Sequence, residues 1–349
     1  MIRRLPESQL TLYAELLDQM IPASAASVMD GALSGSFTSK KIKGNSYWYL
    51  QRSEGAKVRQ IYLGPDSPAL QNWMDRVAQA REIAEPDWAA MRRIGRMLAT
   101  GGASTEPAAV LKVLTLLADS RVFHLGGVLV GTLAFRSYAN ALGVRFARAA
   151  LQTQDVDIAH DPTIGVALAR ETATVKLETV IASSGLGLHP VPPFDRKQPS
   201  TSFKVRGRDL RVDFLTPLHG REGSSAVFLP AFGLSATPLR HLDYLIADSQ
   251  QAVIPGSNVV LVNVPSPARF ALHKLWISGK RPPAFQAKAR KDRLQAQQLI
   301  ELLIEDRPDD LQDAWIALPH DSARKAVQQA TRGFEEQIDV RLSKIVNSP

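Results

Sequence analysis

Three aspartates lie in short segments of alternating residue type, and their carboxylates could together hold divalent cations. Asp155 and Asp157 belong to the segment QDVDIA, and Asp213 belongs to LRVDFL. Alternate residues of a β-strand point to the same face, so the first two carboxylates would project together while their apolar neighbours face a core. Carboxylate oxygens suit Mg²⁺ or Mn²⁺, which can polarise a phosphoryl group. The plainer alternative for each segment is a solvated strand end.

A glycine–threonine pair precedes these segments at a predicted change from strand to helix. Gly131 and Thr132 follow a predicted strand at 122–130, and a predicted helix occupies 132–142. Glycine lets a phosphate approach the backbone, the amides of a helix start bind its oxygens, and threonine adds a hydroxyl. Taken alone, the pair fits an ordinary strand-to-helix turn. Its position before an Asp-x-Asp strand and a later Asp strand favours a phosphate site.

Basic residues concentrate in a predicted helical region between positions 269 and 293. Eight Lys or Arg residues in this stretch accompany a single acid, Asp292. We predict that Lys274 binds phosphate, and Arg281 is the second candidate, because cations near a carboxylate cluster would offset the charge of a nucleotide. The alternative is a solvated basic helix that touches no ligand.

The elements that must position these residues follow from hydrophobic periodicity and turn signals. Helices are predicted at 7–20, 67–98, 108–119, 132–142, 162–184, 268–278, 283–304, 309–317 and 322–345, and the first is expected to end before Pro22. Strands are predicted at 122–130, 156–159, 201–205, 210–215 and within 252–264, besides a β-ribbon within 35–65. Alternating strands and helices around one sheet predict an α/β or α+β domain, and of these we expect an α+β fold with a mixed sheet flanked by helices. We divide it into an N-terminal helical segment with a β-ribbon (1–105), a core (106–250) and a mainly helical C-terminal domain (251–349).

The predicted β-ribbon combines lysines with aromatic residues. Lys40, Lys41 and Lys43 are followed by Tyr47, Trp48 and Tyr49. Nucleic-acid bases can stack on aromatic rings while lysines contact phosphates, so this ribbon could bind nucleic acid. The alternative is that Tyr and Trp fill a small core, because both are common in strands.

Composition limits the class of protein. The 349 residues carry a net charge of +8, which favours phosphate-bearing or polyanionic partners. Cysteine is absent, which excludes disulfides, thiolate metal sites and a cysteine nucleophile. No apolar run approaches the roughly 18 residues of a membrane helix, and the N-terminus lacks a signal-peptide core, so we expect a cytoplasmic protein with no membrane partner. P-loop and Rossmann glycine patterns are also absent.

The ordered combination of motifs resembles the nucleotidyltransferase superfamily that includes DNA polymerase beta. That pattern has Gly then Gly or Ser, an apolar-Asp-apolar-Asp/Glu strand and a third acidic strand. The matching positions are Gly131, Thr132, Asp155, Asp157 and Asp213, and the resemblance covers about 108–245. The segments GTLAF and TQDVD are similar to those of uncharacterised bacterial nucleotidyltransferase-like proteins. The chain departs from the pattern in its threonine, in Gln154 where an apolar residue is usual, and in a longer glycine-to-aspartate spacing.

The resemblance implies an EC 2.7.7-type enzyme that transfers NMP from an NTP such as ATP and releases pyrophosphate. Asp155 and Asp157 would hold Mg²⁺ or Mn²⁺, and Asp213 would join them and act as base or orienter for the acceptor hydroxyl. The acceptor would be an RNA, such as tRNA, or a protein side chain. The alternative is a catalytically inactive protein of the same fold that binds nucleic acid. Modification of a cationic small molecule fits a basic cleft less well.

Overall fold

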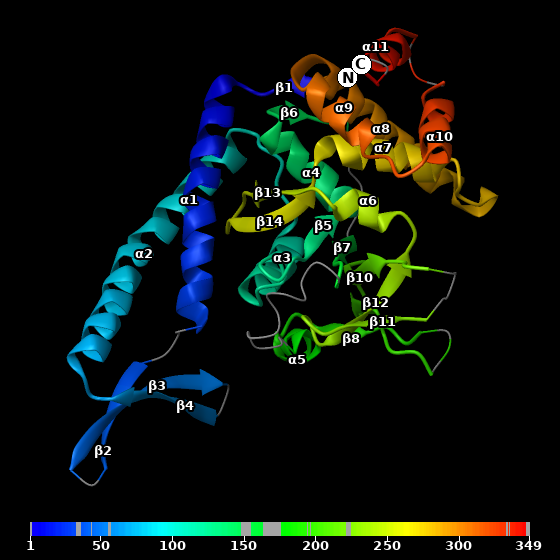
Figure 1. Cartoon of the computed structure of the whole chain (residues 1–349). Coiled ribbons are helices and arrows are strands. Elements are labelled where there is room, and N and C mark those ends of the chain that lie inside the picture. The colour runs from blue at the N-terminus through cyan, green and yellow to red at the C-terminus, as the bar shows by residue number, and fades with distance from the viewer. Residues whose placement is uncertain are drawn as a thin grey trace.

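The computed structural model describes residues 2–32, 36–42, 44–54, 57–147, 155–162, 176–193, 195, 197–220, 225–332, 334 and 336–346. Figure 1 shows three parts: a pair of long helices that carries a small sheet, a central sheet, and a layer of C-terminal helices. This arrangement confirms the predicted α+β class with a mixed sheet flanked by helices.

The central sheet carries the aspartate segments on adjacent strands. Its path is β11 (Val227–Leu229), β12 (Leu234–Leu239), β10 (Arg211–Pro217), β7 (Asp155–Ala159) and β5 (Val128–Val130), with β9 (Ser202–Val205) and β8 (Leu188–Pro190) branching from β10. Strand β10 runs parallel to β7 and β12, whereas β5 and β9 run antiparallel to their neighbours. The sheet is therefore mixed. Helices α3 (Ala108–Asp119), α4 (Gly131–Ala141) and α5 (Leu177–Ser183) accompany it.

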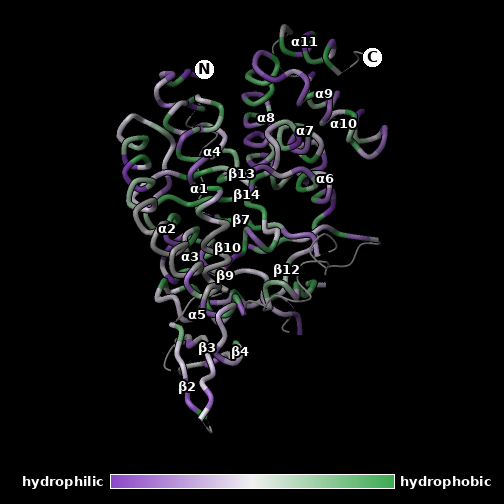
Figure 2. Tube along the Cα trace, turned by 60° about the vertical axis from the view of Figure 1, so that its left-hand side comes forward, coloured by the Kyte–Doolittle hydropathy of each residue, from purple (hydrophilic) through white to green (hydrophobic). Residues whose placement is uncertain are grey.

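A hairpin and a set of helices complete the main core. The hairpin joins β13 (Ser249–Ile254) to β14 (Val260–Pro265), and the helices are α6 (Leu242–Ile246), α7 (Pro267–Ser278), η2 (Pro283–Phe285), α8 (Gln286–Asp306), α9 (Pro308–Ile316), α10 (Asp321–Thr331) and α11 (Glu336–Val346). One hydrophobic cluster extends from α3 and the sheet through these helices. Figure 2 shows hydrophobic residues running along β13, β14 and neighbouring elements. Helix α7 is fixed against α4 because the buried Tyr138 hydroxyl donates to the Pro265 carbonyl at 2.8 Å and its ring meets Phe270 edge-on.

The N-terminal part is a helical stalk with a sheet at its far end. Strand β1 (Arg3–Arg4) pairs with β6 (Val144–Arg145), and α1 (Glu7–Ala32) then packs along α2 (Pro68–Thr100). Between them β2 (Ser36–Ile42), β3 (Asn45–Glu54) and β4 (Lys57–Pro65) form a three-stranded antiparallel sheet. We call β2–β4 the arm sheet. In Figure 1 it stands away from the central sheet.

Several local predictions differ from the structure. Helix α1 continues through Pro22, because packing of its first half against α2 and β13 outweighs the amide lost at proline. The strand predicted at 122–130 begins only at Val128, since the preceding residues form a turn in which the Gly127 amide donates to the Val122 carbonyl at 2.8 Å. The single helix predicted at 322–345 is divided into α10 and α11. Of the helix predicted at 162–184, positions 163–175 lie outside the described residues.

A second, smaller hydrophobic cluster joins the stalk to the core. It contains Tyr13, Leu16 and Met20 of α1, Met91, Ile94 and Leu98 of α2, and Val253, Val259 and Leu261 of the hairpin. The Val253 amide donates a hydrogen bond to the buried Tyr13 hydroxyl at 3.1 Å. Among the described helices, none combines the length and apolar character that a membrane-spanning helix requires.

The Tyr13 hydroxyl supplies a testable measure of this junction. Tyr13→Phe leaves the buried Val253 amide without its acceptor, so we expect a loss of roughly 1–3 kcal/mol in the free energy of unfolding, measured by urea denaturation. Tyr62→Phe is the matched control, because the Tyr62 side chain is 55% exposed and should change stability by less than about 0.5 kcal/mol. Equal effects of the two substitutions would contradict the role of this hydrogen bond.

Candidate active site

Register between two parallel strands brings the three predicted aspartates together. Asp157 of β7 lies directly opposite Asp213 of β10, and Asp155 lies two positions earlier on β7, opposite Arg211. Neighbouring strands are about 4.8 Å apart, so the carboxylates share one face at close range. The alternating residues Val156, Ile158, Val212 and Phe214 are fully buried on the other face. The alternation of apolar and acidic residues thus places the acids on one side of the sheet.

Crowding of these acids perturbs the pKa of Asp157. Burial first, and then the charges of Asp213 and Asp155, raise the pKa of Asp157 to about 6, while Lys274 and Lys288 act in the opposite direction. Near neutral pH the group therefore carries negative charge at an unfavourable position. A perturbed carboxylate between two others is the kind of group that functional sites contain.

Gly131 places the start of α4 directly against Asp157. Val130 pairs with Asp157 across β5 and β7, and α4 begins at the next residue. Gly131 has φ +68°, and a Cβ at this position would collide with Asp157 Oδ2. Only glycine meets both requirements, because other residues rarely adopt this backbone conformation. The amides that open α4 consequently lie beside the carboxylates, where they could bind a phosphate.

Thr132 ties this helix start to α8. Its side chain is buried, and its hydroxyl accepts a hydrogen bond from Gln295 Nε2 at 3.3 Å. Gln295 is itself fully buried. The hydroxyl therefore links the sheet and the C-terminal helices, in addition to its predicted contact with phosphate.

Arg211 holds the third aspartate. Its Nε donates to Asp213 Oδ1 at 2.7 Å, and its Nη2 donates to Ser202 Oγ at 2.9 Å. Both residues lie on the same face of β10, two positions apart. Among the residues that the structure describes, no three His, Asp or Glu side chains are gathered into a ready metal site. The oxygen donors nevertheless fit Mg²⁺ or Mn²⁺ chemically, and a cation would relieve the repulsion that raises the pKa of Asp157.

Lys274 approaches the carboxylates from α7 and is held by a buried acid. Its Nζ lies 2.6 Å from Asp292 Oδ1, and the Arg281 Nη2 lies 2.5 Å from Asp292 Oδ2. Asp292 is 2% exposed. Although burial opposes ionisation, Lys274 and Arg281 hold the pKa of Asp292 below its usual range. The ion-pair network orients Lys274, whose charge reaches Asp157.

The two predicted phosphate ligands of this region occupy different surroundings. Lys274 acts on Asp157, whereas Arg281 lines a cavity of about 870 Å³ between α7, α8 and α10, together with Lys280, Arg290 and Arg293. Lys288 and Lys291 of α8 face the carboxylates instead. The charge of Lys288 opposes the rise in the pKa of Asp157, and the charge of Asp155 opposes the fall that burial causes in the pKa of Lys291. At 100° per residue, Arg290 and Arg293 point away from the face that carries Lys288, Lys291 and Gln295.

Lys288 and Lys291 are functional candidates that sequence reasoning did not select. Both belong to the basic stretch, but charge alone does not distinguish them from Arg290 or Arg293. The sequence signal that could have selected them is their spacing. Lys291, Asp292 and Gln295 follow Lys288 by three, four and seven residues, and residues so spaced lie on one helix face. Which face meets the carboxylates depends on how α8 packs.

A mixed sheet with an Asp-x-Asp strand, a third aspartate on its parallel neighbour and a glycine at the start of the helix that follows β5 defines a nucleotidyltransferase core. The family described as nucleotidyltransferase matches residues 108–319, and the chain belongs to this family. The protein is therefore a transferase enzyme of the EC 2.7.7 class, which confirms the resemblance seen in the sequence. A second family, described as a domain of unknown function (DUF6788), matches residues 5–72. No curated protein and no solved structure matches the chain.

The raised pKa of Asp157 predicts how stability responds to pH. The pKa is about 6 in the folded protein against an ordinary value of 3.8, so the folded state binds the proton more tightly and stability falls as pH rises between these values. Asp157→Asn removes the buried negative charge that destabilises the folded state at higher pH. We expect it to raise the melting temperature in the absence of divalent cations, and by more at pH 7.5 than at pH 4.5. Asp209→Asn, in the exposed turn before β10, is the control; an equal gain at both pH values would contradict the assignment.

The ion pairs of Asp292 with Lys274 and Arg281 predict that removing the Asp292 carboxylate strongly destabilises the fold. Asp292→Ala leaves two cations facing each other without their counter-ion in a buried place, so we expect a loss of about 3–5 kcal/mol in the free energy of unfolding. Asp321→Ala breaks an exposed pair with Arg324 and should cost less than about 1 kcal/mol. Chemical denaturation of both variants makes the comparison, and similar losses would show that the Asp292 network does not hold this region together.

Proposed function

We propose that the protein transfers a nucleoside monophosphate from an NTP to a hydroxyl of an acceptor and releases pyrophosphate. The observation that carries the proposal is the contact of Gly131 with Asp157, because it sets a phosphate-binding helix start against a cluster of three carboxylates. The acceptor oxygen forms a bond to the α-phosphorus, the bond from that phosphorus to the bridging oxygen breaks, and the pair of electrons leaves with pyrophosphate. Such chemistry needs positioning and charge compensation above all.

Asp155, Asp157 and Asp213 would hold Mg²⁺ or Mn²⁺ between them. The bound cation supplies polarisation of the phosphoryl oxygens and activation of the attacking oxygen. Asp213 would also orient the acceptor hydroxyl and take its proton, and Arg211 keeps this carboxylate directed until the substrates bind. The raised pKa of Asp157 supports the proposal, since a divalent cation offsets the same repulsion.

Three lysines and one helix start would receive the triphosphate. The amides at Gly131 and Thr132 and the hydroxyl of Thr132 lie beside Asp157, and Lys274, Lys288 and Lys291 surround the carboxylates from the helical side. Ammonium groups bind phosphate oxygens as point charges. We assign Arg281 to the support of Lys274 through Asp292, and it would contact phosphate only at the outer end of the site.

The acceptor is an RNA or a protein side chain. The charge of +8 and the lysines around the carboxylates favour a polyanion over a cationic small molecule. An aqueous intracellular location suits both acceptors and an NTP donor such as ATP.

The test is transfer of label from each of four α-³²P NTPs, with Mg²⁺ or Mn²⁺, to a mixture of total RNA and protein. We expect one labelled class of acceptor, identified by nuclease and protease digestion. Asp155→Asn combined with Asp157→Asn should reduce labelling more than about a hundredfold, because the carboxylates that would hold the cation are lost, and the transition-state charge is then no longer offset.

Asp209→Asn provides the matched control for this assay, since it removes one exposed carboxylate next to the same strand. It should label the acceptor as the unchanged protein does. Full labelling by the Asp155/Asp157 double variant would overturn the proposal.

A further inference from the structure

One face of the arm sheet gathers three tyrosines that the hydrophobic clusters of the core do not include. Tyr49 of β3 lies opposite Tyr62 of β4, with ring centroids 5.5 Å apart, and Tyr47 lies 6.1 Å from Tyr62. Lys40 of β2 belongs to the same face, since it pairs with Tyr47 and its Nζ lies 5.1 Å from the centre of the Tyr49 ring. We call this surface the tyrosine face.

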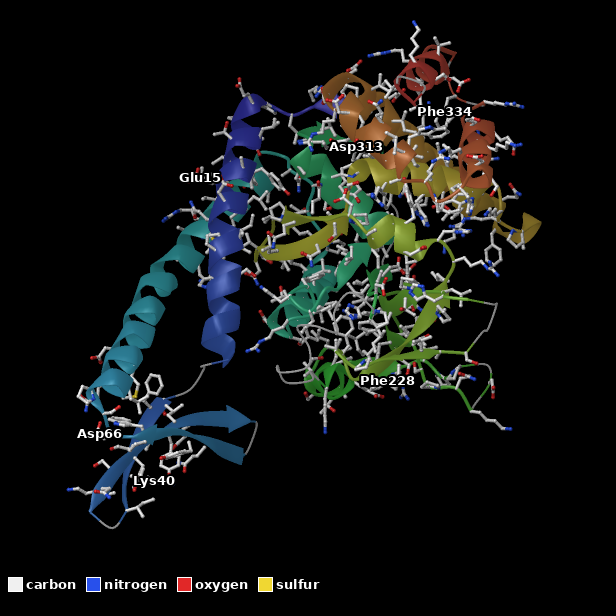
Figure 3. All side chains as sticks on the ribbon, in the orientation of Figure 1. Glu15, Lys40, Asp66, Phe228, Asp313 and Phe334 are labelled. Atoms are coloured by element: carbon white, nitrogen blue, oxygen red, sulfur yellow. The ribbon has the colours of Figure 1, made fainter. Side chains whose placement is uncertain are left out.

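The opposite face of the arm sheet is the one that meets the stalk. Trp48, which points away from the tyrosines, donates its indole N–H to Asp66 at 2.9 Å, and Gln71 of α2 donates to the same carboxylate at 2.7 Å. A Cβ at Gly64 would lie 3.8 Å from Leu70 Cδ2 of α2, so this side of the strand faces the helix. The tyrosine face is consequently left outward, and Tyr62 is 55% exposed. Figure 3 shows Asp66 at the junction with α2 and Lys40 further out on the sheet.

The arm sheet is strongly basic. Between positions 36 and 65 the sequence has six basic residues and one acid: Lys40, Lys41, Lys43, Arg52, Lys57 and Arg59 against Glu54. Lys40 and Lys41 are exposed. Figure 2 shows the hydrophilic stretch at the outer end of β2. A cationic surface of this kind attracts a polyanion.

We propose that the tyrosine face binds single-stranded RNA, and that this strand is the acceptor of nucleotidyl transfer. Exposed aromatic rings stack on unpaired bases, and neighbouring lysines contact the phosphates between them. Glutamines complete the face. Gln51 and Gln60 pair with each other beyond Tyr49 and Tyr62, and Gln60 accepts a hydrogen bond from Lys40, so amides that can bond base edges lie next to the tyrosines. This inference rests on the proposed function only for the role of the strand as acceptor; the binding itself does not depend on it.

The shape of the molecule suits a long ligand. At about 1.5 Å per residue, the 33 residues of α2 extend roughly 50 Å, and the arm sheet lies at the end of this helix that is remote from the core (Figure 1). A ligand that contacts both the tyrosine face and the carboxylates must be an extended polymer. The separate family match over 5–72 also fits a binding module joined to a transferase core.

Fluorescence anisotropy with the full chain tests the binding step without NTP or metal. The probes are a fluorescein-labelled 20-nucleotide RNA without self-complementarity, the same sequence as DNA, and the RNA duplex. We expect the single strands to bind more tightly than the duplex. Tyr62→Ala should weaken binding of the RNA about tenfold, whereas Tyr62→Phe, which retains the ring, should bind as the unchanged protein does.

The salt dependence of the binding constant measures how many phosphate contacts the lysines of the arm sheet make. Lys40→Gln combined with Lys41→Gln should reduce the slope of log K against log salt by roughly 1.4, since each phosphate contact on a single strand contributes about 0.7. Lys325→Gln combined with Arg332→Gln removes the same charge from exposed positions around α10 and should leave the slope unchanged. Circular dichroism confirms that each variant is folded.

The outcomes distinguish this inference from the proposed function. The Asp155/Asp157 double variant should bind RNA with unchanged affinity while it transfers no label. Absence of RNA binding at low salt, or equal binding by Tyr62→Ala, the Lys40/Lys41 variant and the unchanged protein, would overturn the inference. Labelling of a protein by a chain that does not bind RNA would leave the transferase proposal intact and reject the arm as the acceptor site.

Discussion

Repulsion among three carboxylates is the physical constraint on which the rest of the structure depends. Parallel pairing of β7 with β10 sets Asp157 opposite Asp213, and the backbone gives these side chains little freedom to separate. The surroundings therefore have to supply positive charge or hydrogen-bond donors. Arg211 pairs with Asp213 within β10, and the lysines of α7 and α8 supply positive charge from the C-terminal helices. The start of α4 supplies amides beside Asp157. These groups do not cancel the repulsion completely, because the pKa of Asp157 is still raised, and a bound cation would reduce the remaining repulsion.

The C-terminal helices are as much a part of this site as the sheet. Burying Lys274 is costly unless its charge is paired, and Asp292 supplies that partner from α8. Arg281 balances the second oxygen of Asp292 and thereby fixes both helices relative to each other. Together with the Thr132–Gln295 hydrogen bond, this network determines which face of α8 meets the carboxylates. The shared hydrophobic cluster from α3 to α11 makes that arrangement stable.

The stalk has a different relation to the core. It is attached through β1, which pairs with β6, and through a compact cluster around Tyr13 and Val253. Beyond this attachment the two helices depend mainly on each other, and they carry a sheet whose outward face is polar and aromatic (Figure 3). Such a construction separates the chemistry from a second contact surface.

Local patterns in the sequence determined which residues are candidates for the site, whereas only the tertiary structure decided their partners. Strand alternation set Asp155 and Asp157 on one face, and a glycine before a helix marked a candidate phosphate position, because both signals depend on near neighbours in the chain. The pairing of Asp157 with Asp213 joins residues far apart in sequence, and no local rule specifies it. The different surroundings of Lys274 and Arg281, the role of Lys288 and Lys291 and the continuation of α1 through Pro22 likewise follow from helix packing. Periodicity tells which residues share a face, but the burial of apolar surface selects which element that face meets.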